Sequence, residues 1–126
     1  MQSASDRSLE TLTERIISAA FEVSNVLGHG FLESVYQKAL VYELRQRGLA
    51  AHPQAAFRVH YKGQAIGHYY ADLLVERFVV VELKAISALQ PVHVGQVLNY
   101  LRASSLRVGL LLNFGRPKLE YRRVVL

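Results

Sequence analysis

The sequence predicts an α/β protein in which helices flank a mixed β-sheet, and two kinds of periodicity lead to this prediction. Apolar residues recur at spacings of three and four in residues 9–27, in residues 31–47 and again after Pro91, as in amphipathic helices. Alternation with period two, or a short apolar run, indicates five strands, at residues 57–61, 64–75, 78–84, 107–114 and 118–126. The expected order is helix, helix, three strands, helix, strand, strand.

The composition limits the class of protein and partner. The chain has 126 residues, of which 51% are hydrophobic, and this suits one folded domain at residues 9–126 after a disordered N-terminus at residues 1–8. The absence of cysteine excludes disulfides, thiolate metal sites and cysteine nucleophiles, and it fits a cytoplasmic location. No apolar run is long enough for a membrane span, so no membrane partner is expected. A net charge of +5 favours an anionic partner such as nucleic acid.

The first two helices have recognisable ends and one unusual acidic residue. Thr11 with Glu14 forms a candidate capping box for the first helix, Thr13 is the alternative cap, and Gly28 ends the helix. The second helix has an apolar stripe made of Leu32, Val35, Tyr36, Ala39, Leu40 and Leu44. Glu33 lies on the side of this stripe, so it is either a functional carboxylate or a first-turn glutamate favoured by the helix dipole.

Residues 72–84 contain the strand pair around which a site is expected. The apolar run before Glu82 predicts a strand buried on both faces, and Glu82 and Lys84 leave it on the same side. A turn centred on Arg77 pairs Asp72 with Glu82, whereas a two-residue turn would send the Asp72 side chain to the wrong face. We expect the first register, with an odd-membered turn or a bulge near Arg77.

Two carboxylates and a lysine at the rim of a sheet form a candidate Mg²⁺ or Mn²⁺ site. Mg²⁺ is usually held by one or two carboxylates, and such a metal can polarise a phosphoryl oxygen and generate hydroxide near neutral pH. Lys84 could then orient the attacking water or neutralise charge on the phosphate. The alternative is an ordinary exposed ion pair at a strand end. Strand alternation puts His68 and Tyr70 on the face of Asp72, so they are expected near the site if that face carries it.

The C-terminal part adds a crossover helix and a basic edge. Pro91 suits the first turn of the helix, on which Gln96 and Tyr100 are four residues apart and share a side. Because this helix connects the strands at residues 78–84 and 107–114, those strands are expected to be parallel. The last strand is expected at the edge of the sheet, with a basic patch made of Arg116, Lys118, Arg122 and Arg123. These charges either contact nucleic acid or discourage edge aggregation.

Several of these motifs together resemble a known superfamily. Asp72 followed by Glu82-Leu-Lys84 resembles the D…(D/E)xK signature of the PD-(D/E)XK nucleases, and the order of elements resembles their restriction-endonuclease-like core. Residues 30–36, Gly-Phe-Leu-Glu-Ser-Val-Tyr, are similar to the motif of the GxxExxY proteins, a bacterial and archaeal branch of this superfamily. Residues 96–100 are similar to the Gln-x-x-x-Tyr helix motif of RecB-like nucleases.

The resemblance covers residues 9–126 and implies a role for each matching residue. The residues implied are Asp72, Glu82 and Glu33 as metal ligands, Lys84 as the catalytic lysine, and Gln96 and Tyr100 as substrate-positioning residues. The sequence departs from the family pattern at two places, because Ala71 replaces a proline before the first aspartate and Gly95 precedes the helix motif.

Two functions are compatible with these features. The first is a Mg²⁺- or Mn²⁺-dependent endo- or exonuclease that hydrolyses phosphodiester bonds of nucleic acid, with DNA as the expected substrate. The second is a non-catalytic module on the nuclease fold that binds nucleic acid through its basic patch or assembles as a homo-oligomer. Loss of Asp72 would remove the first function and leave the second.

Overall fold

In a computed structural model, residues 5–126 form an α/β fold around a five-stranded mixed sheet, and these are the residues that the structure describes. The helices are α1 (Asp6–Leu27), α2 (Glu33–Gln46) and α3 (Pro91–Ser104). The strands are β1 (Ala51–Tyr61), β2 (Gln64–Val75), β3 (Val79–Lys84), β4 (Val108–Asn113) and β5 (Glu120–Val125). The predicted fold class and element order are confirmed.

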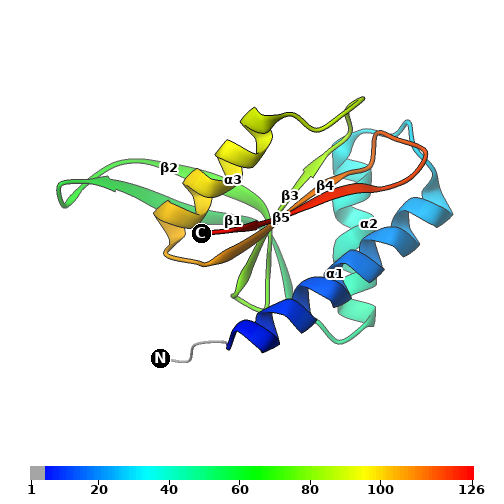
Figure 1. Cartoon of the computed structure of the whole chain (residues 1–126), viewed down its shortest axis with the longest axis horizontal. Helices are drawn as coiled ribbons and strands as arrows, with labels where there is room; N and C mark the ends of the chain where they lie inside the picture. Colours follow the sequence, from blue (N-terminus) through cyan, green and yellow to red (C-terminus); the bar gives the residue numbers. More distant parts are fainter. Residues whose placement is uncertain (1–4) are drawn as a thin grey trace.

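The sheet has the strand order β1-β2-β3-β4-β5, so β5 is an edge strand as expected. Neighbouring strands are antiparallel except β3 and β4, which are parallel and connected through α3. Figure 1 shows α1 and α2 on one side of the sheet and α3 on the other. We call these sides the α1/α2 face and the α3 face. The β1–β2 hairpin extends beyond the layers and runs beside α3 (Figure 1).

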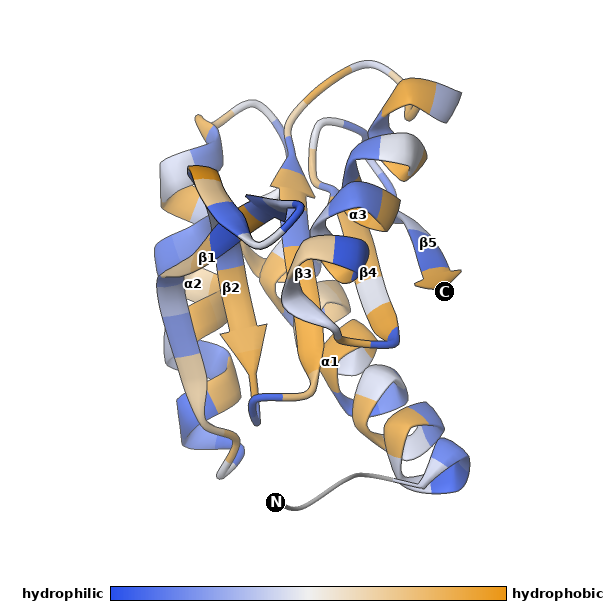
Figure 2. Ribbon diagram, turned by 90° about the vertical axis from the view of Figure 1, so that its left-hand side faces the viewer, coloured by the Kyte–Doolittle hydropathy of each residue, from blue (hydrophilic) through white to orange (hydrophobic). Residues whose placement is uncertain are grey.

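Each face of the sheet has its own hydrophobic core. On the α1/α2 face, Leu83 and Leu110 pack with buried residues of both helices, whereas Val80 and Leu111 pack on the α3 face. Burial on both faces explains why β3 and β4 are apolar along most of their length (Figure 2). Among residues 5–126, no helix combines the length and the apolar character that a membrane crossing requires.

The first helix begins earlier than predicted. The Ser5 side chain caps it, because its Oγ accepts a hydrogen bond of 3.1 Å from the Ser8 amide. Thr11 and Thr13 are therefore not caps, and Thr13 instead donates its hydroxyl to the Glu10 carbonyl. The start was missed because residues 6–8 are polar and contribute nothing to the apolar stripe. Residues 6–8 belong to the segment that was predicted to be disordered, but they are helical. Residues 1–4 of that segment lie outside the described residues.

The buried stripe of α2 is narrower than predicted. Tyr36, Leu40 and Leu44 are buried, but Leu32 is 78% exposed and Val35 is 37% exposed. Leu32 is the residue before the first helical turn and has an extended backbone, so helical periodicity does not apply to it.

Candidate metal and catalytic site

The β2–β3 turn sets the register on which the site depends. Leu73 pairs with Val81 and Val75 pairs with Val79, which leaves an odd-membered turn centred on Arg77. Arg77 and the residue before it both have positive φ angles, 64° and 54°, so the chain reverses tightly without a glycine. The register and the odd-membered turn expected from the sequence are confirmed.

Asp72 and Glu82 meet where the β2–β3 ladder ends, and we call them the acid pair. The Asp72 amide donates a hydrogen bond of 3.1 Å to Glu82 Oε1, and the Leu83 amide donates one of 2.8 Å to Asp72 Oδ2. Each carboxylate therefore binds the backbone of the opposite strand, next to the last regular pair of the ladder. Glu82 is only 7% exposed. The two side chains are held together by backbone geometry.

The electrostatics of the acid pair disfavour two negative charges. Burial, followed by the charge of Asp72, raises the pKa of Glu82 to about 8, and the charge of Lys84 partly opposes the shift. Near neutral pH Glu82 is therefore largely protonated when nothing else neutralises the pair. A perturbed carboxyl of this kind is typical of functional sites.

Two stacked tyrosines flank the acid pair on the α3 face. The rings of Tyr69 on β2 and Tyr100 on α3 have centroids 4.2 Å apart at 10°, and the Tyr69 hydroxyl donates to the Tyr100 carbonyl at 2.6 Å. Burial, followed by the negative charge of Glu82, raises the pKa of Tyr100, and burial raises the pKa of Tyr69 to about 12. The structure thus brings Tyr100 close to the acid pair and adds Tyr69, which the sequence reasoning missed.

Tyr69 was missed because β2 does not alternate regularly. Tyr69 and Ala71 face α3 before Asp72, but Leu74 faces α3 after it, so the alternation shifts by one residue at Asp72. The β1–β2 pairing skips Gln54 at this level, and Gln54 has a φ of 53°. The expectation that His68 and Tyr70 lie near the site is wrong, because they are exposed on the side away from Tyr69.

Glu33 lies apart from the acid pair, on the first turn of α2, with its side chain exposed. Gln37, one turn further along the same side of α2, donates its Nε2 to the Asp72 carbonyl at 2.9 Å. This bond fixes the helix that carries Glu33 to the strand that carries Asp72. Within residues 5–126, no three His, Cys, Asp or Glu side chains lie close enough together to form a metal cluster.

Tyr36 fixes the shape of the connection between α1 and α2. Its buried hydroxyl donates to the Gly28 carbonyl at 2.7 Å and accepts from the Phe31 amide at 3.2 Å. Its ring stacks on Phe114 at 4.8 Å, just beyond β4. Gly28 has a φ of 71°, which lets α1 end sharply. Tyr36 therefore holds the segment that positions Glu33.

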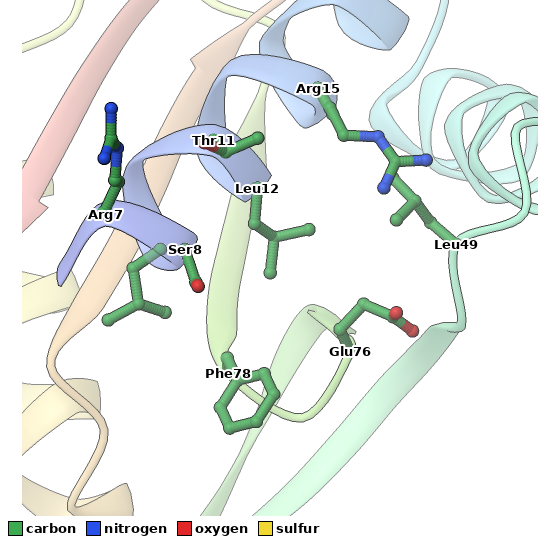
Figure 3. Close-up of a pocket in the computed structure, with 9 residues that line it drawn as sticks. Arg7, Ser8, Thr11, Leu12, Arg15, Leu49, Glu76 and Phe78 are labelled. Atoms are coloured by element: carbon green, nitrogen blue, oxygen red, sulfur yellow. The ribbon is translucent and has the colours of Figure 1, made fainter. Parts of the chain in front are cut away.

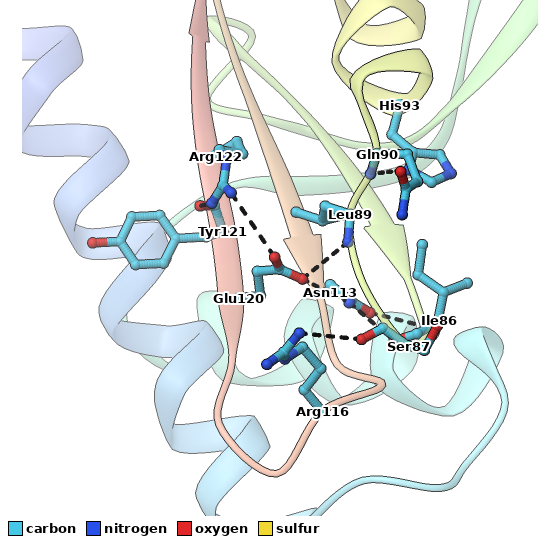
Figure 4. Close-up of polar contacts among 10 residues, drawn as sticks. All are labelled: Ile86, Ser87, Leu89, Gln90, His93, Asn113, Arg116, Glu120, Tyr121 and Arg122. Atoms are coloured by element: carbon cyan, nitrogen blue, oxygen red, sulfur yellow. Dashed lines mark hydrogen bonds and ion pairs between the residues drawn. The ribbon is translucent and has the colours of Figure 1, made fainter.

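Asn113 anchors the segment that follows Lys84. The buried side chain of Asn113 accepts a hydrogen bond from the Ile86 amide and donates to the Ile86 carbonyl and to Glu120 (Figure 4). It also accepts a hydrogen bond from the Gly115 amide. The bond from Asn113 lowers the pKa of Glu120 against the opposing effect of burial. This network fixes residues 85–90, which lead from Lys84 at the end of β3 into α3.

The four basic residues near the C-terminus do not form one continuous patch. Arg122 pairs with Leu111 of the α3 face, whereas Arg123 pairs with Leu110 of the α1/α2 face, so their side chains project from opposite faces. Arg116 donates to the Ser87 carbonyl at 3.3 Å (Figure 4), and Lys118 is exposed. Gln96 is also exposed, one helical turn before Tyr100.

Two cavities mark opposite ends of the β2–β3 pair. One, of about 680 Å³, lies between the β1–β2 hairpin and α3, and we call it the hairpin groove; its lining includes Val59, His60, Tyr69, Asn99, Tyr100 and Arg102. The other, of about 460 Å³, lies by the β2–β3 turn and is lined by Arg7, Arg15, Glu76 and Phe78, among others (Figure 3). Of these two cavities, only the hairpin groove is lined by Tyr69 and Tyr100, the tyrosines that flank the acid pair.

The acid pair fits a divalent cation. One oxygen of each carboxylate accepts a backbone hydrogen bond, and this leaves Asp72 Oδ1 and Glu82 Oε2 as the candidate oxygen ligands. A pair of carboxylates with water is a sufficient protein ligand set for Mg²⁺. A cation would also remove the unfavourable interaction that raises the pKa of Glu82.

Comparisons with known proteins agree with this geometry. Residues 10–124 match the family described as the PD-(D/E)XK nuclease superfamily. The crystal structure of SSO0001 has a similar fold, with a TM-score of 0.55 and 18% sequence identity. That similarity covers 92% of this chain but only 58% of the other, so this chain spans little more than half of that protein's length. No functionally curated protein matches the chain.

Proposed function

Because the chain belongs to the PD-(D/E)XK nuclease superfamily, we propose that it is a metal-dependent nuclease that hydrolyses phosphodiester bonds, with DNA as its substrate. The observation that carries the proposal is the acid pair. Asp72 and Glu82 are held together by backbone hydrogen bonds although burial and mutual repulsion raise the pKa of Glu82 to about 8. Such an arrangement costs stability unless a cation binds there, which supports a role in chemistry.

The side chains around the acid pair suit phosphodiester hydrolysis. Mg²⁺ or Mn²⁺ held by Asp72 and Glu82 would polarise a phosphoryl oxygen and lower the pKa of a bound water. Lys84 leaves β3 two residues after Glu82, and its ammonium supplies positive charge where negative charge develops on the phosphate. Tyr100 offers a hydroxyl beside the pair, and we assign it, with the exposed Gln96, to positioning of the substrate.

We further assign the chain to the GxxExxY branch, with Glu33 as a carboxylate that acts near the metal. The Tyr36 hydrogen bonds to Gly28 and Phe31 support this assignment, because through them the tyrosine of the motif holds the glycine-containing turn in place. The Gln37 bond to the Asp72 carbonyl also supports it, since it ties the helix of Glu33 to the site.

The decisive experiment compares Lys84→Ala with Lys38→Ala, which removes an exposed lysine from α2. Cleavage of labelled single-stranded and supercoiled DNA is measured with Mg²⁺ and with Mn²⁺, and circular dichroism verifies the fold. Lys84→Ala should lose at least about a hundredfold in rate, as expected for loss of one transition-state contact, while Lys38→Ala cleaves like the wild type. A Lys84→Ala protein that retains full activity would exclude this mechanism.

Metal binding provides an independent test by calorimetry. Wild-type protein should bind Mn²⁺ with release of protons near pH 7, because the cation displaces the proton shared by the acid pair. Asp72→Asn should lose most of this binding. If wild-type and Asp72→Asn proteins bind Mn²⁺ equally, the metal is not held by the acid pair.

A further inference from the structure

The hairpin groove opens beside the acid pair. Tyr69 and Tyr100 line the groove and pack in the cluster that contains Ala71 and Val80. Ala71 precedes Asp72 on β2, and Val80 lies two residues before Glu82 on β3. The groove is walled by the hairpin on one side and by the C-terminal half of α3 on the other, which run next to each other (Figure 1). A molecule lying in the groove would therefore reach the acid pair at the tyrosine end.

The elements that form the two walls carry basic residues, and acidic residues are missing from long intervals of their sequence. The sequence has no Asp or Glu between Glu43 and Asp72, and none between Glu82 and Glu120. Those two intervals contain the whole of β1, β2 as far as Asp72, and all of α3. Their basic residues include Arg58, His60 and Lys62 on the hairpin and Arg102 on α3, whereas six of the ten acidic residues of the chain lie on α1 and α2. The asymmetry matches an extended polyanion on the hairpin side of the protein.

The lining of the groove suits an unpaired strand. A register shift between Val59 and His60 lets two consecutive residues of β1 line the cavity, so His60 joins Arg102 and Asn99 as a polar contact. Tyr100 adds an aromatic ring that is only partly buried. Aromatic rings stack with bases that are free of a duplex, and basic side chains bind the intervening phosphates. In a duplex the base faces are not available to such a ring.

We propose that the hairpin groove binds a single strand of nucleic acid and leads it to the acid pair. The assignment of the strand as substrate rests on the nuclease function proposed above. The groove contacts the segment that flanks the scissile phosphate, with Arg102 and His60 on its phosphates and Tyr100 against a base.

Binding without turnover tests the groove directly. The wild-type chain is compared with Arg102→Ala and with Arg7→Ala, which removes the same charge from an exposed position on α1. Each protein is titrated in EDTA against a fluorescein-labelled oligothymidylate of about 15 nucleotides and against a blunt duplex, by anisotropy at several salt concentrations. Arg102→Ala should weaken strand binding about tenfold at low salt and reduce the salt slope by about 0.7, the value for one phosphate of a single strand. Arg7→Ala should change neither quantity, and the duplex should bind more weakly than the strand.

Three results would overturn the proposal: no strand binding by the wild type, equal losses in Arg102→Ala and Arg7→Ala, or tighter binding of the duplex. A cleavage assay in Mn²⁺ separates this proposal from the nuclease function. Strand binding that depends on Arg102 without any cleavage would refute the nuclease and keep the groove as a binding site. Cleavage that is unchanged in Arg102→Ala would refute the groove and keep the nuclease.

Discussion

Replacing Glu82 with glutamine should stabilise the metal-free protein at alkaline pH while removing its metal site. The pKa of Glu82 rises from 4.5 to about 8, first because of burial and then because of the Asp72 charge. Each pKa unit corresponds to about 1.4 kcal/mol, so ionised Glu82 costs the folded state about 5 kcal/mol. Glutamine has the same length, stays neutral, and keeps an oxygen that can accept the Asp72 amide.

The direction of the pH dependence follows from the two pKa values of Glu82. Between pH 4.5 and about 8 the folded protein holds a proton that the unfolded chain has released. The contribution of Glu82 to stability is therefore fully present below this window and falls as pH rises through it. In Glu82→Gln this fall is absent, so the stability difference between variant and wild type should grow from near zero at pH 4.5 to about 5 kcal/mol at pH 9.

Urea unfolding in EDTA at a series of pH values measures this difference. The five histidines are common to both proteins, so their titration cancels when the two curves are subtracted. Asp72→Asn should remove only part of the pH dependence, because the burial of Glu82 remains. Adding Mg²⁺ at pH 8 should stabilise the wild type and not Glu82→Gln. Parallel curves for Glu82→Gln and wild type would refute the electrostatic account of the acid pair.

Three other substitutions test the scaffold by thermal or chemical unfolding. Tyr36→Phe should lower the free energy of unfolding by about 1 to 3 kcal/mol, because the Gly28 carbonyl loses its hydrogen-bond donor. An unchanged stability would contradict the role of Tyr36 in holding the connection between α1 and α2. Gly115→Ala should be strongly destabilising, since its new Cβ would lie 2.3 Å from backbone atoms of Ile86. Gly95→Ala is the matched control, because nothing lies within 4 Å of its Cβ, and it should stabilise α3 by up to about 1 kcal/mol.

Sequence periodicity predicted the sheet and the acid pair because both depend on strongly determined residues. The apolar run before Glu82 permits only a strand buried on both faces, and the number of residues between Asp72 and Glu82 permits only one register that brings them together. Both features are local in sequence, and local patterns are what a single sequence reveals. The crossover through α3 then required β4 to run parallel to β3.

The features that were missed depend on contacts between distant segments. The positive φ of Gln54 and the shift in alternation at Asp72 bring Tyr69 instead of Tyr70 to the α3 face. No residue type near Gln54 or Asp72 in the sequence indicates either feature. The separation of Arg122 from Arg123 was the exception, because strand alternation alone predicts it. Because Arg122 and Arg123 are adjacent in the sequence, they were assigned to one basic patch, but neighbouring residues of a strand lie on opposite faces of the sheet.

The odd-membered β2–β3 turn has a consequence for variation in chain length. Surface turns usually tolerate insertions and deletions. Deleting one residue here would slide β3 by one position, and its valines suit either face of the sheet because both faces are buried. Glu82 would then point to the α1/α2 side, away from Tyr100. Length variants at this turn should therefore keep the architecture and lose the acid pair, so homologous chains that differ in length at this turn are the natural place to look for inactive members.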